Sequence, residues 1–230
     1  MSTVAVIPVK QLENAKQRLS GVLNPGQRQS LFQAMFKDVL EAATTCDGIE
    51  RVIVMTDDGQ VAEIAAEFGA EVWPEPAARG LIPAVTAAGA RLAAEGTDTM
   101  LFLPADIPLI TVEELEVVLE GFGERALPAF MIVPAHDLGG SNCVLVAPPD
   151  CMEFGFGEDS FRRHLRLARA RGIEASVARL PGIGLDVDVP DDLFELVREV
   201  VDRNLDTWTA RLLRDTGLAT SVTDSLKRIG

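Results

Sequence analysis

The stretch "LFLPADIPLI", residues 101–110, decides the fold: an apolar run ends at one carboxylate, Asp106, and Pro108 follows. Short apolar runs of this kind are typical of buried strands. The next residues, from Thr111 to Glu114, have the S/T-x-x-E form of a capping box, which marks the start of a helix. In open α/β sheets, ligands collect outside the carboxyl ends of the strands. We therefore expect Asp106 at that edge, either binding a ligand or capping a turn.

The alternation of apolar runs and helical segments continues along the chain and predicts an α/β fold. The expected architecture is a single domain with a mixed, mostly parallel sheet flanked by helices. We predict strands at residues 4–9, 51–56, 71–73, 99–103, 130–133, 143–147, 174–178 and 184–187. We predict helices at residues 26–45, 60–68, 81–95, 112–122, 160–171 and 191–201, with a further helix around residues 204–214.

Composition limits the classes of partner. The chain has 230 residues, 47% of them hydrophobic, and a formal charge of -14 from 35 acidic and 21 basic residues. Nucleic acid and anionic membranes need a basic face, so we expect neither as a partner. The three cysteines form no CxxC pair, and no apolar stretch reaches the roughly 18 residues of a membrane span. We expect a cytoplasmic protein.

The chain divides at about residue 201. Residues 1–201 carry the regular alternation of the main domain, whereas residues 202–230 form a helical extension with a polar end. The apolar side chains of the extension need a surface to cover, which is either the domain itself or a second subunit. A homodimer through the extension is therefore one expectation. These side chains are Leu205, Trp208, Leu212 and Leu213.

A basic segment follows the first predicted strand. Residues 7–28 contain Lys10, Lys16, Arg18 and Arg28 but only one acid, Glu13, in an otherwise acidic protein. A positive loop at the carboxyl end of a strand suits a polyphosphate, although ordinary solvated lysines would look the same. The segment matches neither the P-loop nor the dinucleotide-binding glycine pattern.

Two alternating aspartates, Asp186 and Asp188, occur in the predicted strand of "GLDVDVPDDL", residues 184–193. In a strand, Asp186 and Asp188 point to opposite faces, so only one of them can join Asp106. One or two carboxylates, completed by substrate phosphates and water, are the usual site for Mg²⁺. The other aspartate is then expected to cap the helix that begins near Pro190.

Two glycine-containing segments are candidate anion sites. In "DLGGSN", residues 137–142, Gly140 precedes the polar side chains of Ser141 and Asn142, although a plain hairpin turn would look similar. In "FGFGEDSFRRH", residues 154–164, glycines precede a helix that starts near Ser160, and helix N-termini bind anions. His164 lies on the same helical face as Ser160, where a single histidine is more often structural.

The basic run in that helix is expected to be a solvated surface, because a helix turns only some neighbouring side chains toward one ligand. The run consists of Arg162, Arg163, His164, Arg166, Arg169 and Arg171, most of which we expect to face solvent. A proline-rich loop at residues 74–80 ends at Gly80 before an alanine-rich helix, where a base or another strand could approach closely.

Together and in this order, residues 4–193 resemble the CofC/FbiD family of guanylyltransferases of coenzyme F-420 biosynthesis. The resemblance rests on "IPVKQLENAKQRLSGVL", Gly80-Leu81, "LPADIP", "GGSN", "FGEDSFRRH" and "LDVDVPDDL". The family is similar to MobA-like nucleotidyltransferases. It implies a Rossmann-like domain of the nucleotide-diphospho-sugar transferase type. It also implies Mg²⁺ on Asp106 and one aspartate of "LDVDVP", for which Asp188 is preferred and Asp186 is the alternative.

The implied reaction transfers GMP from GTP to 2-phospho-L-lactate, phosphoenolpyruvate or a phosphoglycerate, with release of pyrophosphate. The resemblance implies Lys16, Arg18 and Asp106 as catalytic residues. The implied substrate-binding residues are Lys10, Gly80, Gly140, Ser141, Asn142, Gly157 and Ser160.

The chain departs from the family at Ile82-Pro83, where relatives often carry asparagine, and in the extension after residue 201. Two alternatives stay open. One is a MobA-like enzyme for molybdopterin, although the glycine-rich opening loop of that group is missing. The other is a non-catalytic nucleotide-binding domain.

Overall fold

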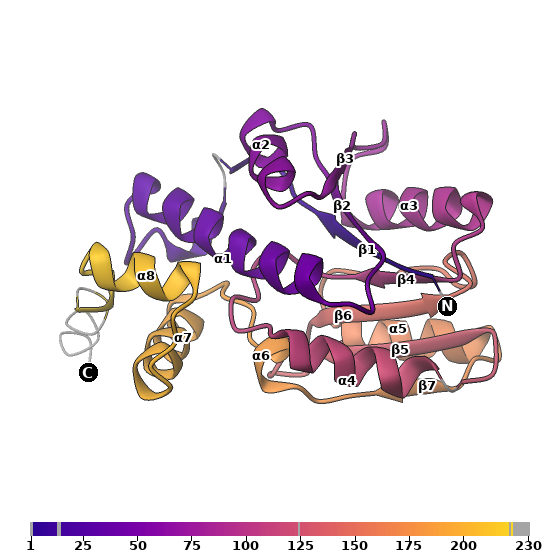
Figure 1. Ribbon diagram of the computed structural model, residues 1–230. Helices are drawn as coiled ribbons and strands as arrows, with labels where there is room; N and C mark the ends of the chain where they lie inside the picture. Colours follow the sequence, from indigo (N-terminus) through magenta and orange to yellow (C-terminus); the bar gives the residue numbers. More distant parts are fainter. Residues whose placement is uncertain (1, 13–14, 124, 221, 223–230) are drawn as a thin grey trace.

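The computed structural model describes residues 2–12, 15–123, 125–220 and 222. These residues form a central seven-stranded sheet with helices packed around it (Figure 1). The strand order is β3-β2-β1-β4-β6-β5-β7. Strands β1 to β4 run parallel, β6 is antiparallel to both β4 and β5, and β7 is parallel to β5. The predicted mixed, mostly parallel sheet is confirmed. The strands are β1 (Thr3–Pro8), β2 (Arg51–Met55), β3 (Glu71–Trp73), β4 (Thr99–Phe102), β5 (Ala129–Pro134), β6 (Ser141–Ala147) and β7 (Ala175–Val177).

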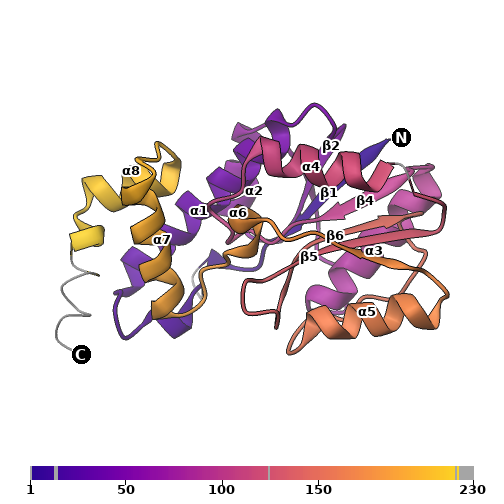
Figure 2. The ribbon, with the colours of Figure 1, turned by 90° about the horizontal axis from the view of Figure 1, so that it is seen from below.

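Helices cover both faces of the sheet, as Figure 2 shows. Helices α3 (Leu81–Glu95) and α5 (Ser160–Ala170) cover one face, and α1 (Pro25–Thr45), α2 (Gly59–Glu67) and α4 (Val112–Gly123) cover the other. The remaining helices are the 3-10 helix η2 (Gln17–Leu19), α6 (Pro181–Gly184), α7 (Pro190–Asp202) and α8 (Trp208–Asp215). Each face has its own apolar cluster, because side chains alternate along each strand.

The capping box predicted at the start of α4 is only half formed. The Thr111 hydroxyl accepts the Glu114 backbone N–H at 3.2 Å, as a capping box requires. The Glu114 carboxylate accepts the backbone N–H groups of Gly182 and Ile183 instead, at 2.8 and 2.7 Å. Glu114 therefore caps the start of α6, a distant segment that would otherwise leave buried donors unpaired.

The strand predicted at residues 184–187 is wrong. Gly184 ends α6, and the residues after it are extended but lie in no strand of the sheet. Isolated backbone bonds connect this segment to the sheet region, from His136 N–H to Gly184 O at 2.9 Å and from Val187 N–H to Asp106 O at 3.1 Å. Strand β4 already has β1 and β6 on its two sides, so the segment can only cross its carboxyl end.

The C-terminal extension packs on its own domain. Helix α8 lies beside α1 (Figure 1), and its Ala210 and Leu213 are buried in the same apolar cluster as α1. Asp38 of α1 accepts the backbone N–H groups of Trp208 and Thr209 at 2.7 and 3.1 Å, which satisfies donors at the start of α8. Of the two surfaces expected for the extension, this helix therefore covers the domain itself. Among the described residues, no helix combines the length and the apolar character needed to cross a membrane.

Candidate active site

A group of two carboxylates and one ammonium lies at the carboxyl edge of β4; we call Lys16, Asp106 and Asp188 the carboxylate site. The Lys16 Nζ contacts Asp106 Oδ2 and donates to Asp188 Oδ1 at 2.7 Å. The lysine side chain is 5% exposed, whereas the two aspartates are 21% and 46% exposed. The ammonium is therefore enclosed and each carboxylate keeps an open side. Lys16, Asp106 and the preferred aspartate, Asp188, are thus brought together.

The backbone of Lys16 is held in an unusual conformation. It lies in the left-handed region, at φ 54° and ψ 42°, and starts η2. This region costs a residue with a side chain about 1–2 kcal/mol, so it persists only where other contacts hold it. Burial lowers the pKa of Lys16, but the charges of Asp106 and Asp188 outweigh it and raise the pKa overall. The ammonium stays charged.

Asp188 is held in place by its neighbours rather than by a strand. The backbone N–H groups of Asp188 and Val189 both donate to the Asp192 carboxylate at 2.9 Å. Further back, a Cβ on Gly182 would lie 2.1 Å from the backbone oxygen of Leu109, so only glycine fits where α6 crosses the chain leaving β4. The segment from α6 to α7 is therefore pinned on both sides of Asp188.

Asp186 has a different partner. Its Oδ1 accepts the Asn142 Nδ2–H at 3.0 Å, and the same amide donates to Ile183 O at 3.0 Å. Burial, together with the charges of Asp106 and Asp188, raises the pKa of Asp186 to about 6 against the lowering effect of the Asn142 bond. Asn142, which the resemblance implies for substrate binding, is 3% exposed, and its side-chain amide orients Asp186.

A second group lies where β6 and α5 begin; we call Ser141, Ser160 and His164 the hydroxyl site. Ser160 Oγ donates to Ser141 Oγ at 3.0 Å, and Ser141 Oγ lies 3.1 Å from His164 Nδ1. The resemblance assigned both serines to the acid, and the fold brings them together. The "DLGGSN" segment is also the hairpin turn between β5 and β6 that we weighed as the alternative.

A β-bulge aims the side chains of this turn. Val133 pairs with Cys143 but Pro134 pairs with Ser141, so Asn142 has no partner opposite it. The extra residue turns Ser141 toward α5 and Asn142 toward α6, as their hydrogen bonds show. A regular strand would have placed Ser141 and Cys143 on the same face.

The main cleft lies beside the carboxylate site and has a volume of about 770 Å³. This volume is in the usual range for a small-molecule site. Asp106, Lys10 and Gly80, three of the candidate site residues, line the cleft, and Gly80 precedes α3 at φ 127°. A smaller hollow of about 350 Å³ shares Asp106 with it and adds Lys16, Arg18 and Asp188.

Four charged residues of the cleft were missed: Asp57, Asp58, Glu75 and Arg79. Arg79 forms ion pairs with Asp57 and Glu75, and all three line the cleft. Each side chain follows the carboxyl end of β2 or β3, so their positions after predicted strands were the available signal. Lys10 and Arg18 are exposed and add positive charge at the same edge.

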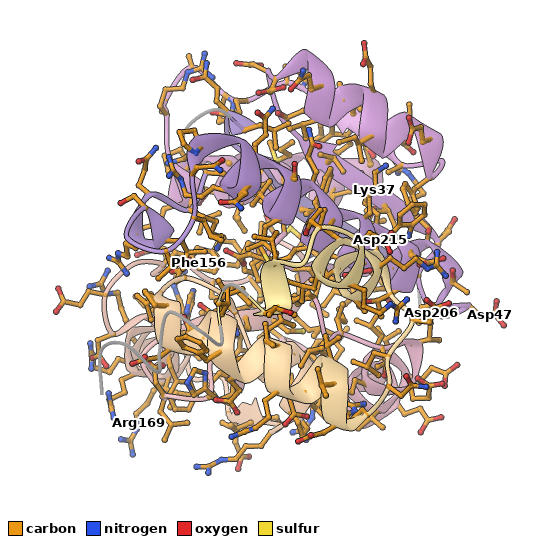
Figure 3. The ribbon with its side chains drawn as sticks, turned by 90° about the vertical axis from the view of Figure 1, so that its left-hand side faces the viewer. Lys37, Asp47, Phe156, Arg169, Asp206 and Asp215 are labelled. Atoms are coloured by element: carbon orange, nitrogen blue, oxygen red, sulfur yellow. The ribbon has the colours of Figure 1, made fainter. Side chains whose placement is uncertain are left out.

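The predicted solvated surface on α5 is confirmed for the arginines of the basic run, whereas His164 is buried. All five arginines of the basic run are exposed, and Figure 3 shows Arg169 projecting outward at the rim. Gly157 has φ 108° and Asp159, at the start of α5, has φ 53°, so both lie in the region that favours glycine. Gly140 lies in the turn before β6, where its carbonyl accepts the Ala135 N–H at 3.1 Å.

The fold matches solved nucleotidyltransferase structures. One is a protein of Desulfovibrio desulfuricans G20, named as a nucleotide-diphospho-sugar transferase, with a TM-score of 0.79 and 19% sequence identity. The match covers 96% of this chain and 99% of that protein's chain. A 4-diphosphocytidyl-2C-methyl-D-erythritol synthase has a TM-score of 0.59 at 16% identity, covering 87% of this chain and 99% of its own. At these identities the likeness shows the fold alone.

The sequence matches closer relatives over most of its length. It is 38% identical over 201 residues to a phosphoenolpyruvate guanylyltransferase of Conexibacter woesei, covering 87% of this chain and 89% of the relative. It is 36% identical to a 3-phospho-D-glycerate guanylyltransferase of Colwellia psychrerythraea, with 84% and 90% covered. It is 34% identical to a 2-phospho-L-lactate guanylyltransferase of Methanothermobacter thermautotrophicus, with 86% and 85% covered. The family model described as "Guanylyl transferase CofC like" matches residues 3–228, and the chain therefore belongs to this family.

Proposed function

We propose that this protein transfers GMP from GTP to the phosphate group of a phosphorylated three-carbon acid. A phosphate oxygen of the acid attacks the α-phosphorus of GTP, the bond to the bridging oxygen breaks, and pyrophosphate leaves. The product carries a new diphosphate link, as a guanylated precursor of coenzyme F-420 does. The observation that carries the proposal is one ammonium held between Asp106 and Asp188 beside the main cleft.

Mg²⁺ fits the carboxylate site. A cation is already stabilised between Asp106 and Asp188, and each carboxylate keeps an open side for a further ligand. Among the described residues, no group of three or more histidine, cysteine or acidic side chains is arranged to hold a metal. A site with two protein oxygens, completed by phosphate and water, is the usual arrangement for Mg²⁺. When bound, the ion would neutralise phosphate charge and polarise the α-phosphorus.

The demand on the protein is electrostatic. Two unit charges at 4 Å repel by about 4 kcal/mol at an effective dielectric near 20, and here two anions must meet. Phosphoryl-type transfer needs no covalent intermediate, so positioning and positive charge are enough. Lys16 is enclosed at the site, and Arg18 and Lys10 line the two hollows. We assign these three residues to the phosphates of GTP.

We assign the acid to the hydroxyl site, at Ser141 and Ser160, with the backbone of Gly157 beside them. The three relatives are named for three different acids, which differ by small groups on one carbon skeleton. Discrimination between such acids rests on one or two pocket contacts. The choice among them is therefore a question for direct measurement.

The test is pyrophosphate release with GTP and Mg²⁺ against phosphoenolpyruvate, 3-phospho-D-glycerate and 2-phospho-L-lactate. ATP and CTP serve as nucleotide controls, and chelation of Mg²⁺ serves as the metal control. We expect release with GTP and one of the acids, and loss of release on chelation. Binding of GTP without release with any acid would contradict the proposal and favour a non-catalytic nucleotide-binding domain.

A homodimer and a cytoplasmic location stay predictions. The extension covers α1 of its own chain, so a dimer would need a different surface of the extension. The mass of the protein in solution tests the dimer, and a monomeric mass at working concentration would contradict it.

A further inference from the structure

His164 is enclosed in the apolar face between the sheet and α5. Its side chain is 0% exposed, and its ring packs edge-on against Phe156 at 4.8 Å between centroids. The ring centroids of Phe130 and Phe154 lie 6.3 and 6.4 Å from that of His164. A buried imidazole in such surroundings is stable only when both of its nitrogens have hydrogen-bond partners.

The partners of the ring fix the position of its proton. The backbone N–H of Gly155 donates to His164 Nε2 at 3.0 Å, so Nε2 must carry a lone pair. Burial lowers the pKa of His164 to about 4, against the raising effect of the Ser160 backbone, so the ring is neutral near pH 7. A neutral imidazole has one N–H, and this hydrogen is therefore on Nδ1, the nitrogen 3.1 Å from Ser141 Oγ.

The tautomer determines what the two serines can do. With the hydrogen on Nδ1, the ring acts as a hydrogen-bond donor toward Ser141. It cannot accept a hydrogen from either serine hydroxyl at that nitrogen. One hydroxyl hydrogen is used in the bond between Ser160 and Ser141. The other hydroxyl hydrogen has no acceptor among the residues that the structure describes. The opposite tautomer would accept from Ser141 and would use up both hydrogens.

We propose that His164 is a positioning residue that keeps the Ser141–Ser160 pair able to donate a hydrogen bond to an anionic oxygen of the phosphorylated acid. The proposal rests on the proposed function for the identity of the ligand. It rests on the structure for the hydrogen bonds themselves. A neutral donor pair suits a carboxylate or phosphate oxygen because it adds no charge that the protein must bury.

Two substitutions separate the two roles of the ring. In His164→Asn, the short amide places an N–H near the Nδ1 position and keeps donation toward Ser141. In His164→Gln, the longer amide reaches the Nε2 position and keeps an acceptor for Gly155 instead. We expect His164→Gln to raise KM for the acid by about tenfold or more, because a hydrogen bond to a charged group is lost. His164→Asn should raise it less, and KM for GTP should change little in both.

A double-mutant cycle tests whether His164 acts through Ser141. In a Ser141→Ala background, His164→Gln should add little further change in KM for the acid. Ile173→Val is the matched control, because it loosens the same apolar cluster without touching a polar group. It should lower thermal stability and leave KM for the acid unchanged.

The tautomer has a direct readout that does not depend on activity. A ¹⁵N spectrum of the ring nitrogens of His164 in the wild-type protein should show Nδ1 protonated and Nε2 unprotonated. A protonated Nε2, equal losses of acid and GTP affinity, or a full effect of His164→Gln without Ser141 would each overturn this inference. Failure of the proposed function looks different, because wild-type protein would then release no pyrophosphate with any acid.

Discussion

The carboxylate site and the hydroxyl site lie on the same edge of one sheet but are built in opposite ways. The carboxylate site brings together charged side chains 90 and 172 residues apart in the sequence. The hydroxyl site brings together neutral side chains only 19 and 23 residues apart. The first depends on the whole fold, whereas the second depends on one hairpin and one helix.

The difference also determines how large a free-energy cost a substitution has at each site. Removing one member of a buried charged group leaves its partners uncompensated, which is costly. Removing one neutral hydrogen bond costs about 0.5–1.5 kcal/mol when both partners can adjust. Substitutions should therefore have large effects at the carboxylate site and moderate effects at the hydroxyl site, and the following tests are ordered accordingly.

The largest effect is expected for Asp106→Asn. It removes one of the two carboxylates that bond Lys16 and, in our proposal, one ligand of the metal. Turnover should fall at least about a hundredfold, since metal-based charge stabilisation is worth several kcal/mol. The protein should still fold, because Lys16 keeps Asp188. Pyrophosphate release and thermal unfolding measure the two effects.

Asp98→Asn is the matched control for this change. Asp98 precedes the opposite end of β4 and its carboxylate accepts the Ser2 N–H at 2.8 Å, far from the ligand edge. Turnover should be unchanged. A fully active Asp106→Asn protein would return Asp106 to a capping role.

The next test compares the two aspartates before α7. Asp188→Asn should reduce turnover nearly as much as Asp106→Asn, because the Lys16 ammonium also donates a hydrogen bond to Asp188. Asp186→Asn should reduce it less, because Asp186 is bonded to Asn142. The Mg²⁺ concentration for half-maximal turnover should rise mainly in the first variant. The reverse order would make Asp186 the metal residue.

Glu114→Gln should have a smaller effect, and mainly on stability. A glutamine has one oxygen and cannot accept both N–H groups at the start of α6, so the free energy of unfolding should fall by about 1–3 kcal/mol. Turnover should fall in part, because α6 leads directly to Asp188. Glu116→Gln, on the exposed side of the same helix, is the control and should change neither quantity. Equal melting temperatures for both variants would exclude the capping role.

Local pattern predicted the parts of the molecule that depend on local physics. The apolar runs before Asp106 and before Pro134 form strands of the buried sheet. The carboxyl ends of these strands lie at the ligand edge. The alternation around Asp186 and Asp188 also looked like a strand. It is not one, because both sides of β4 are already paired, and no sequence pattern displays strand order.

Long-range polar contacts account for the other differences. Glu114 fitted a local capping box, yet its carboxylate satisfies donors 68 and 69 residues away. The sequence around His164 favoured a structural role for this histidine. The position of its ring hydrogen depends on its contacts with Gly155 and Ser141. Both residues had partners that spacing cannot reveal, because the fold decides which buried donors are left unpaired.

The smallest effect is expected away from both sites, at the junction of α1 and α8. Burial raises the pKa of Asp38 from 3.8 to about 7, against the lowering effect of its bonds to Trp208 and Thr209. Between these values the folded protein holds a proton that the unfolded chain has released. The free energy of unfolding should therefore fall as the pH rises from about 4 to about 7, by at most about 1.4 kcal/mol per pH unit, with no further change from Asp38 above that range.

Urea unfolding at pH 5 and pH 8 measures this effect, and Asp38→Asn is the comparison, because asparagine does not titrate. The wild-type protein should lose more stability than the variant between the two pH values, while pyrophosphate release should respond to pH alike in both. A parallel loss of stability would mean that Asp38 stays ionised throughout. The two N–H groups of α8 would then hold the carboxylate as firmly as Lys16 holds Asp106, and burial of charge would be tolerated at both ends of the molecule.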